Sequence, residues 1–174
     1  MGLYPVKILF NKPSSQRWDT SVKTIEIKGL TVQGVMVRTR NADEGQAETA
    51  RIGKLWKDYA VQVAPRMSPE AKVYGVYYGY ESDASGAFNV LAGCDKDLAL
   101  DANGQAWACV NLSPGSYLVF ESRGAMPQAL VTTWFEIWSY FADPQCPHQR
   151  AYTTDFEYHR ETGAVDVHIA LLAP

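Results

Sequence analysis

The first predicted strand region is marked by alternation of apolar and polar residues. Segment 23–38 alternates and is rich in β-branched residues, and Gly29 interrupts it at the point where we expect the strand to bend. The polar stretch NADEGQAE at 41–48 predicts a loop. The pattern therefore predicts a bent strand region followed by a polar connection.

Helical spacing replaces the alternation from Glu48 onward. Apolar residues recur at intervals of three and four, which places them on one stripe of an amphipathic helix that ends before Pro65. The stripe consists of Ile52, Leu55, Trp56, Tyr59 and Val63. After it, segments 72–81 and 87–93 predict the two strands of a hairpin, joined by the turn-forming residues 82–86.

The second half of the chain repeats this order of elements. Segment 117–121 predicts a strand, and segments 150–159 and 164–172 predict a second hairpin around the turn 160–163. Between them lies a second helical stripe, which ends at Asp143 and Pro144. This stripe consists of Leu130, Trp134, Ile137, Trp138 and Phe141.

One offset relates the two halves at the level of residues. A shift of 78 positions superimposes both the helix and the strand that follows it. The matched pairs are Ile52 with Leu130, Trp56 with Trp134, Tyr74 with Tyr152, and Tyr80 with Tyr158. Because a single offset joins two successive elements, we predict a tandem duplication of a βαββ unit.

The predicted fold class is α+β. Two βαββ units, at about 23–98 and 108–173, cannot each bury a sheet face and a helix stripe alone. We therefore expect a single domain over 23–174, in which two main helices pack beside a shared antiparallel sheet. A ligand cleft is expected at the pseudo-two-fold axis between the units. Residues 1–22 form an N-terminal extension whose order the sequence leaves open.

Charge and cysteine usage exclude several function classes. The net charge is −3 and no basic stripe is present, which argues against direct contact with nucleic acid. The three cysteines form no CxxC motif, and the apolar stretch near the N-terminus is too short for a signal peptide or a membrane span. We expect a cytoplasmic protein without metal, cofactor or membrane association. Aromatic residues make up 12% of the chain, a high proportion that calls for an explanation.

The duplication is broken at one informative position. Under the 78-residue shift Gly79 corresponds to Glu157, so one copy has no side chain where the other has a carboxylate among aromatic residues. Such a carboxylate is costly to bury unless a positive charge meets it. A roomy aromatic cup with one anion inside suits a flat hydrophobic cation, which ring faces attract by about 0.5 to 2 kcal/mol each.

Plainer interpretations of these residues stand beside that hypothesis. Thr153, Asp155, Glu157 and His159 share one face of an alternating strand, as on a solvated sheet face. Asp155 and Glu157 also have the spacing of an acid and base pair. Trp56 and Trp134 lie on helix stripes and are expected in the core, Glu136 is expected on the surface, and His159 and His168 are expected to form a surface pair.

Several stretches together resemble a known family. They are IGKLWKDY at 52–59, VYGVYYGYESDASGAFNVLAG at 73–93, NLSPGSYLVFE at 111–121, the second Trp-containing helix, and DFEYH at 155–159. In order and spacing these stretches resemble the GyrI-like effector-binding domain, the sensor of AraC-type and MerR-type multidrug regulators. That domain also occurs in stand-alone, integron-cassette-associated effector-binding proteins. The resemblance covers about residues 23–173.

The resemblance implies two βαββ units and an aromatic cleft that accepts hydrophobic, often cationic compounds. The strand glutamate of the family maps onto Glu157, next to Tyr158. A helix-turn-helix does not fit into the 22 residues before the domain, so direct promoter binding does not transfer. The family also includes proteins that act on partners such as gyrase and some with hydrolytic activity.

Three hypotheses of function follow. The first is a binding module for hydrophobic or cationic small molecules, which reports to a separate DNA-binding regulator or other protein. Its proposed ligand-binding residues are Glu157, Tyr78, Tyr80, Phe88, Trp138 and Tyr158. The second is a hydrolase of electrophilic small molecules with Glu157 as general base and Tyr152 or Tyr158 as acid. The third is a gyrase-inhibitor-like protein-interaction module.

Overall fold

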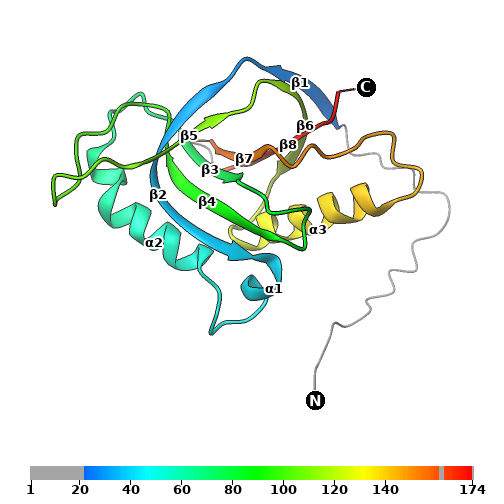
Figure 1. Ribbon diagram of the computed structural model, residues 1–174, viewed down its shortest axis with the longest axis horizontal. Coiled ribbons are helices and arrows are strands. Elements are labelled where there is room, and N and C mark those ends of the chain that lie inside the picture. Colours follow the sequence, from blue (N-terminus) through cyan, green and yellow to red (C-terminus); the bar gives the residue numbers. More distant parts are fainter. Residues whose placement is uncertain (1–21, 161–162, 174) are drawn as a thin grey trace.

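The fold is built on one curled antiparallel sheet of eight strands. The computed structural model describes residues 22–160 and 163–173, and its strands follow the order β1-β6-β8-β7-β3-β4-β2-β5 (Figure 1). Apart from Val22, the predicted N-terminal extension lies outside the described residues, as do two residues of the predicted turn 160–163. The α+β class with a shared antiparallel sheet is confirmed.

Both halves contain the predicted order of a strand region, a main helix and a hairpin. The elements of the first half are β1 (Lys23–Ile27), β2 (Leu30–Arg40), α1 (Asn41–Glu44), α2 (Ile52–Gln62), the short 3-10 helix η1 (Ala64–Arg66), β3 (Val73–Tyr78) and β4 (Ala87–Cys94). Those of the second half are β5 (Ala108–Leu112), β6 (Gly115–Ser122), α3 (Gln128–Ala142), β7 (Thr154–His159) and β8 (Val165–Ala170).

The two halves meet at the centre of the sheet. Strand β3 pairs with β7, and Tyr77 lies opposite Asp155. These two positions are separated by the same 78-residue offset that relates the halves, so the pseudo-two-fold axis passes between them. Outward from this pair the strand order is the same on both sides, with β8 corresponding to β4 and β6 to β2.

The predicted strand region at 23–38, with its bend at Gly29, is two strands with different partners. Gly29, with a φ of +105°, breaks the segment, a conformation that glycine adopts without steric cost. Before the break, β1 pairs with β6 of the other half, whereas after it β2 pairs with β4 and β5. The halves therefore exchange their edge strands, which the alternation alone does not encode.

The predicted loop at 41–48 contains the short helix α1. Its last residue, Glu44, accepts hydrogen bonds from the backbone N–H groups of Arg51 and Ile52, at 3.0 and 3.1 Å. These are unpaired N–H groups at the start of α2, which a carboxylate stabilises. Glu44, within the polar stretch, therefore stabilises the first turn of α2.

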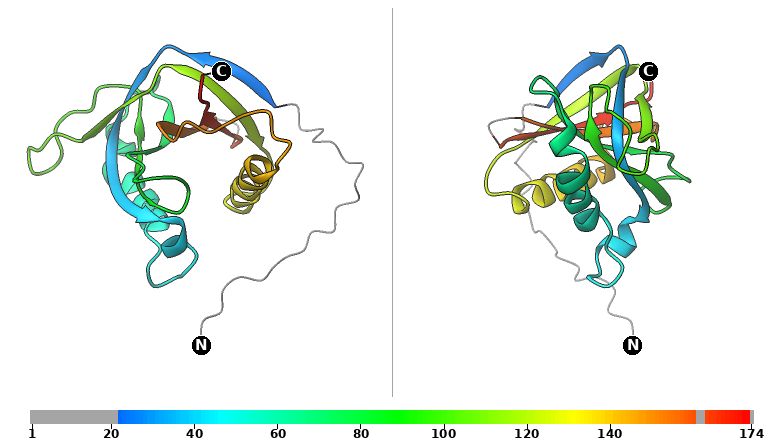
Figure 2. Two further views of the ribbon diagram at one scale, coloured as in Figure 1. Left: turned by 45° about the vertical axis from the view of Figure 1, so that its right-hand side comes forward. Right: turned by 90° about the vertical axis from the view of Figure 1, so that its left-hand side faces the viewer.

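Alternation along the strands divides the side chains between two faces. Helices α2 and α3 share one face, where Leu55 packs in a cluster with Val90, and Ile137 packs in a cluster with Val167. Trp134 contacts both clusters and so links the halves. The opposite face holds a separate core that includes Tyr74, Tyr117 and Phe156. Figure 2 shows the curl of the sheet and the separation between α2 and α3.

Strands β2 and β4 approach each other closely at a pair of glycines. Gly34 lies opposite Gly93, and a Cβ at position 34 would lie 2.1 Å from the carbonyl oxygen of Ala92. We expect Gly34→Ala to lower the free energy of unfolding by about 3 kcal/mol or more, because backbone on both strands has to move. Urea unfolding followed by circular dichroism measures the change.

The matched control is Gly53→Ala in α2, where a Cβ meets nothing within 4 Å. Replacing a helical glycine by alanine stabilises by up to about 1 kcal/mol. Equal effects of the two substitutions would show that the approach of β2 and β4 is not the constraint described here.

Candidate functional site

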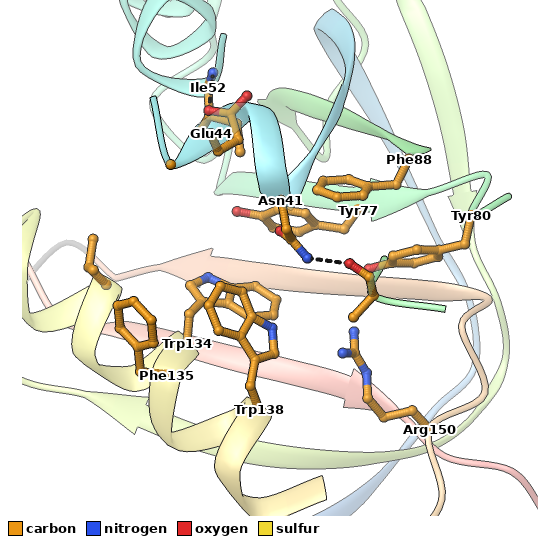
Figure 3. A pocket seen from close by; sticks show the side chains of 13 residues that line it. Asn41, Glu44, Ile52, Tyr77, Tyr80, Phe88, Trp134, Phe135, Trp138 and Arg150 are labelled. Atoms are coloured by element: carbon orange, nitrogen blue, oxygen red, sulfur yellow. Dashed lines mark hydrogen bonds between the residues drawn. The ribbon is translucent and has the colours of Figure 1, made fainter. Parts of the chain in front are cut away.

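An apolar cavity of about 420 Å³ lies on the helix-bearing face of the sheet. Side chains from α1, α2, β3, β4 and α3 line it, together with the β3–β4 connection and the segment before β7 (Figure 3). The lining residues are Asn41, Glu44, Gly45, Ile52, Tyr77, Tyr80, Ala84, Phe88, Val131, Trp134, Phe135, Trp138 and Arg150. Six of these residues are aromatic, and one of the six, Phe135, is exposed at the rim of the cavity.

Glu157 lies buried directly behind two of these aromatic side chains. The Tyr77 hydroxyl and the Trp134 indole N–H both donate to Glu157 Oε1, at 2.7 and 2.8 Å. His159 Nε2 lies 3.2 Å from Oε2, and the carboxylate residue is only 1% exposed. The space it occupies depends on Gly75, since a Cβ there would lie 3.0 Å from Oε2.

A second buried carboxylate, Asp155, lies two residues earlier on the same face. Its Oδ2 accepts from the Tyr80 hydroxyl at 2.7 Å and from the Arg150 guanidinium at 2.6 Å. Its Oδ1 accepts from the backbone N–H of Ala170 at 2.8 Å. Asp155 and Arg150 form a buried ion pair, so this charge is balanced, as a buried carboxylate requires.

The tyrosines that contact these acids have altered acidity. Burial raises the pKa of Tyr77 well above its ordinary value, and the negative charge of Glu157 raises it further. Burial and Asp155 likewise raise the pKa of Tyr80, although Arg150 opposes the effect. Both phenols therefore remain protonated donors to their carboxylates across the physiological range.

The structure brings some of the predicted site residues together and separates others. Tyr80, Phe88 and Trp138 line the cavity, and Glu157 lies behind its wall. Tyr78 and Tyr158 pack against the core of the opposite sheet face instead. The alternation explains this, because Tyr158 neighbours Glu157 along β7 and must point the other way.

The interpretation of 153–159 as a solvated face is wrong. Asp155 and Glu157 are buried, and only Thr153 is exposed. His159 and His168 do not form a surface pair either, because His168 is buried on the opposite face and stacks on Phe156 with ring centroids 4.1 Å apart. Burial lowers the pKa of His168.

Other expectations are also corrected. Gly79 does not open the cavity, because it is exposed with a φ of +61°, and Gly75 makes the space instead. Trp134 is a cavity and carboxylate contact rather than only a core residue. Trp56, by contrast, packs against the core cluster as expected, and it also lies against His159, with ring centroids 4.6 Å apart. Glu157 is not the single charged group expected among the aromatic residues, because Asp155 and Arg150 lie at the same site.

The predicted set of ligand-binding residues leaves out Tyr77, Trp134 and Arg150. A signal existed for Tyr77, since it shares the strand face of Gly75, the residue that lies opposite Glu157. For Trp134 the signal was the match with Trp56 under the duplication, but a helix stripe does not say which tryptophan reaches the axis. Arg150 follows an irregular segment, and no periodicity locates it.

Other kinds of site find no support in the described residues. Within 22–160 and 163–173, no group of three or more His, Cys, Asp or Glu side chains is arranged to hold a metal ion. Among the helices of that same part of the chain, none combines the length and apolar character needed to cross a membrane.

The raised pKa of Tyr77 predicts a loss of stability in alkali. The folded protein holds the phenolic proton to a higher pH than the unfolded chain, whose tyrosines ionise near 10.0. The stabilisation is therefore complete below pH 10 and is lost as the pH rises toward the folded pKa, by at most about 1.4 kcal/mol per pH unit.

Tyr77→Phe removes this dependence together with a hydrogen bond to a charged group. We expect the variant to be less stable at pH 7 by about 1.5 to 3 kcal/mol and to lose less stability than the natural protein above pH 10. Urea unfolding at a series of pH values measures both effects. Parallel declines of the two proteins above pH 10 would contradict the assignment.

Comparison with known structures places this geometry among related folds. The integron cassette protein VCH_CASS2 of Vibrio cholerae is 42% identical over 87% of this chain and 95% of its own, with a TM-score of 0.79. The structure of SAV2435 bound to tetraphenylphosphonium is 17% identical, covering 87% of this chain and 94% of its own, with a TM-score of 0.62. A search of curated proteins found no match.

A family model agrees with the structural comparison. The model of the integron-associated effector binding protein, Cass2, matches residues 24–174, which is nearly the whole chain. The match spans both βαββ units and every residue that lines the cavity. The chain therefore belongs to the Cass2 family of integron-associated effector binding proteins.

Proposed function

We propose that this protein binds hydrophobic cations in the aromatic cavity, with Glu157 as the source of charge selectivity. The observation that carries the proposal is the buried state of Glu157. In the described part of the chain, its polar side-chain contacts are Tyr77, Trp134 and His159, and none of its ion pairs involves Lys or Arg. The carboxylate thus leaves a negative potential behind the cavity wall, which a bound cation offsets.

Two aromatic side chains connect the charge of Glu157 to the ligand. Tyr77 and Trp134 donate hydrogen bonds to Glu157 and also line the cavity. Hydrogen bonding to an anion polarises the donor, and the ring faces attract cations through their quadrupoles by about 0.5 to 2 kcal/mol each. A cation can therefore gain from Glu157 without direct contact with it.

The remaining charges on the wall do not oppose this preference. Arg150 is paired with Asp155, and Glu44 adds a second carboxylate, which is bound to the backbone at the start of α2. The cavity volume of about 420 Å³ lies in the range of small-molecule sites, about 300 to 1,000 Å³. The bound tetraphenylphosphonium of SAV2435, which shares the fold, makes that compound a suitable probe.

The proposed role of binding is that of an effector sensor acting through a separate regulator. Val131 and Phe135 line the cavity and are 43% and 59% exposed on α3, so the rim is open at this helix. A ligand that covers these side chains changes the surface that a partner protein contacts. DNA contact is assigned to that partner because of the acidic charge of this chain.

The test is Glu157→Gln, with affinity measured by isothermal titration calorimetry. We expect tetraphenylphosphonium to bind at least about 10-fold more weakly to the variant, equivalent to about 1.4 kcal/mol, since the amide keeps the shape and loses the charge. The neutral triphenylphosphine oxide should change by less than about 3-fold. Equal losses for both compounds would reject the charge role of Glu157.

Two further variants control for folding and for hydrophobic contact. Glu136→Gln, on the exposed side of α3, should leave both affinities unchanged. Trp138→Ala should weaken both compounds, because it removes a wall that does not discriminate charge. Turnover of p-nitrophenyl acetate that Glu157→Gln abolishes would instead favour the hydrolase hypothesis.

A further inference from the structure

Arg150 is the only Lys or Arg among the described residues that line the cavity, and it is held firmly. Its guanidinium bonds Asp155 at 2.6 Å and stacks 4.4 Å from the ring centre of Tyr152. The side chain is 5% exposed, and Figure 3 shows it extending beside Trp138 toward Tyr80. A stacked, ion-paired arginine presents its remaining donors in a fixed direction.

Those remaining donors are incompletely used. The hydrogen bond of Arg150 to Asp155 comes from one terminal nitrogen, and Nε is buried without an acceptor within the described chain. A buried donor left unpaired costs about 1 to 3 kcal/mol. Asp155 already accepts from the Tyr80 hydroxyl and the Ala170 N–H as well as from the terminal nitrogen of Arg150. Because Nε is enclosed by protein, an acceptor on a ligand would meet Arg150 at its terminal nitrogens, at the end of the cavity that this side chain lines (Figure 3).

The charge balance decides what kind of acceptor fits. Asp155 already neutralises Arg150, and both Glu44 and Glu157 add negative charge to the same cavity. An additional carboxylate on a ligand would be repelled by these groups. A neutral oxygen, as in a ketone, ester or amide, accepts a hydrogen bond without that penalty.

The distance between Asp155 and Glu157 indicates how far apart the carbonyl oxygen and the cationic centre of a ligand should be. Asp155 and Glu157 are two residues apart on β7, which corresponds to about 6.5 to 7 Å along the strand. We propose that Arg150 makes the cavity select hydrophobic cations that also carry a neutral carbonyl oxygen roughly one such spacing from the cationic centre. This inference rests on the proposed function, since it assigns a second specificity determinant to the same site.

A matched pair of phosphonium compounds tests the inference. The ester probe is (4-ethoxy-4-oxobutyl)triphenylphosphonium, and heptyltriphenylphosphonium has the same cation and chain length without oxygen. We expect the natural protein to bind the ester about 10-fold more tightly, despite its lower hydrophobicity, because the ester carbonyl accepts from Arg150. Isothermal titration calorimetry gives both dissociation constants.

The preference should depend on Arg150. In the double variant Arg150→Met with Asp155→Asn, which removes both members of the ion pair, the ratio of the two affinities should fall to about 1 or below. Arg150→Lys keeps a positive charge for Asp155 but loses the planar donor set, and it should lower the ratio as well. This second variant covers the case in which the double variant does not fold.

The outcomes separate the two proposals. If the natural protein binds the heptyl compound as tightly as the ester or more tightly, the role of Arg150 is overturned while cation binding stands. If the ester preference persists in Arg150→Lys and in the double variant, Arg150 is not its source and the inference fails. If neither compound binds, the proposed function fails, and the inference fails with it.

Discussion

The burial of one carboxylate at the centre of the sheet constrains much of the rest of this structure. Glu157 is 1% exposed, so its solvation by water is lost and must be replaced by protein donors. Tyr77 from β3 and Trp134 from α3 supply those donors. Gly75 supplies the space, since a side chain there would press on both the carboxylate and Trp56. The burial of Glu157 therefore requires a donor from β3, a donor from α3 and a glycine at position 75.

The pseudo-two-fold arrangement explains why this acid lies near the centre of the sheet, behind the wall of the cavity. The axis passes between Tyr77 and Asp155, where two equivalent strands meet, and equivalent helices flank them. A symmetric assembly would place like groups on both sides of the axis. Here Glu157 corresponds to Gly79, and Asp155 corresponds to Tyr77, so the symmetric scaffold carries unequal chemistry. The result is an anionic region near Trp134 and an arginine-bearing end near Tyr80.

The sequence carries enough information for the scaffold and part of the site. The helical stripes gave α2 and α3 to within a few residues, and the 78-residue offset gave the relation between the halves. The sequence singles out Glu157 because it breaks that offset. Periodicity, however, does not encode which strands become neighbours. The exchange of edge strands after Gly29 depends on long-range pairing and was therefore not predicted.

Side-chain direction accounts for the remaining differences at the site. Tyr78 and Tyr158 were grouped with Glu157 because they are close in sequence, but neighbours on a strand point to opposite faces. Tyr77 and Trp134 required knowledge of the β3–β7 register and of the position of α3. The buried pair of Asp155 and Arg150 joins a strand to an irregular segment, for which no local pattern exists.

The central claim is that the buried carboxylate of Glu157 gives the aromatic cavity its preference for positive charge. Tetraphenylphosphonium and tetraphenylborate have nearly the same shape and opposite charge, so their affinities for the natural protein measure the charge preference of the cavity directly. The account predicts that the phosphonium binds at least about 100-fold more tightly, equivalent to about 2.7 kcal/mol, in calorimetric titrations at one salt concentration. Equal affinity for the two ions, or tighter binding of the borate, would contradict it.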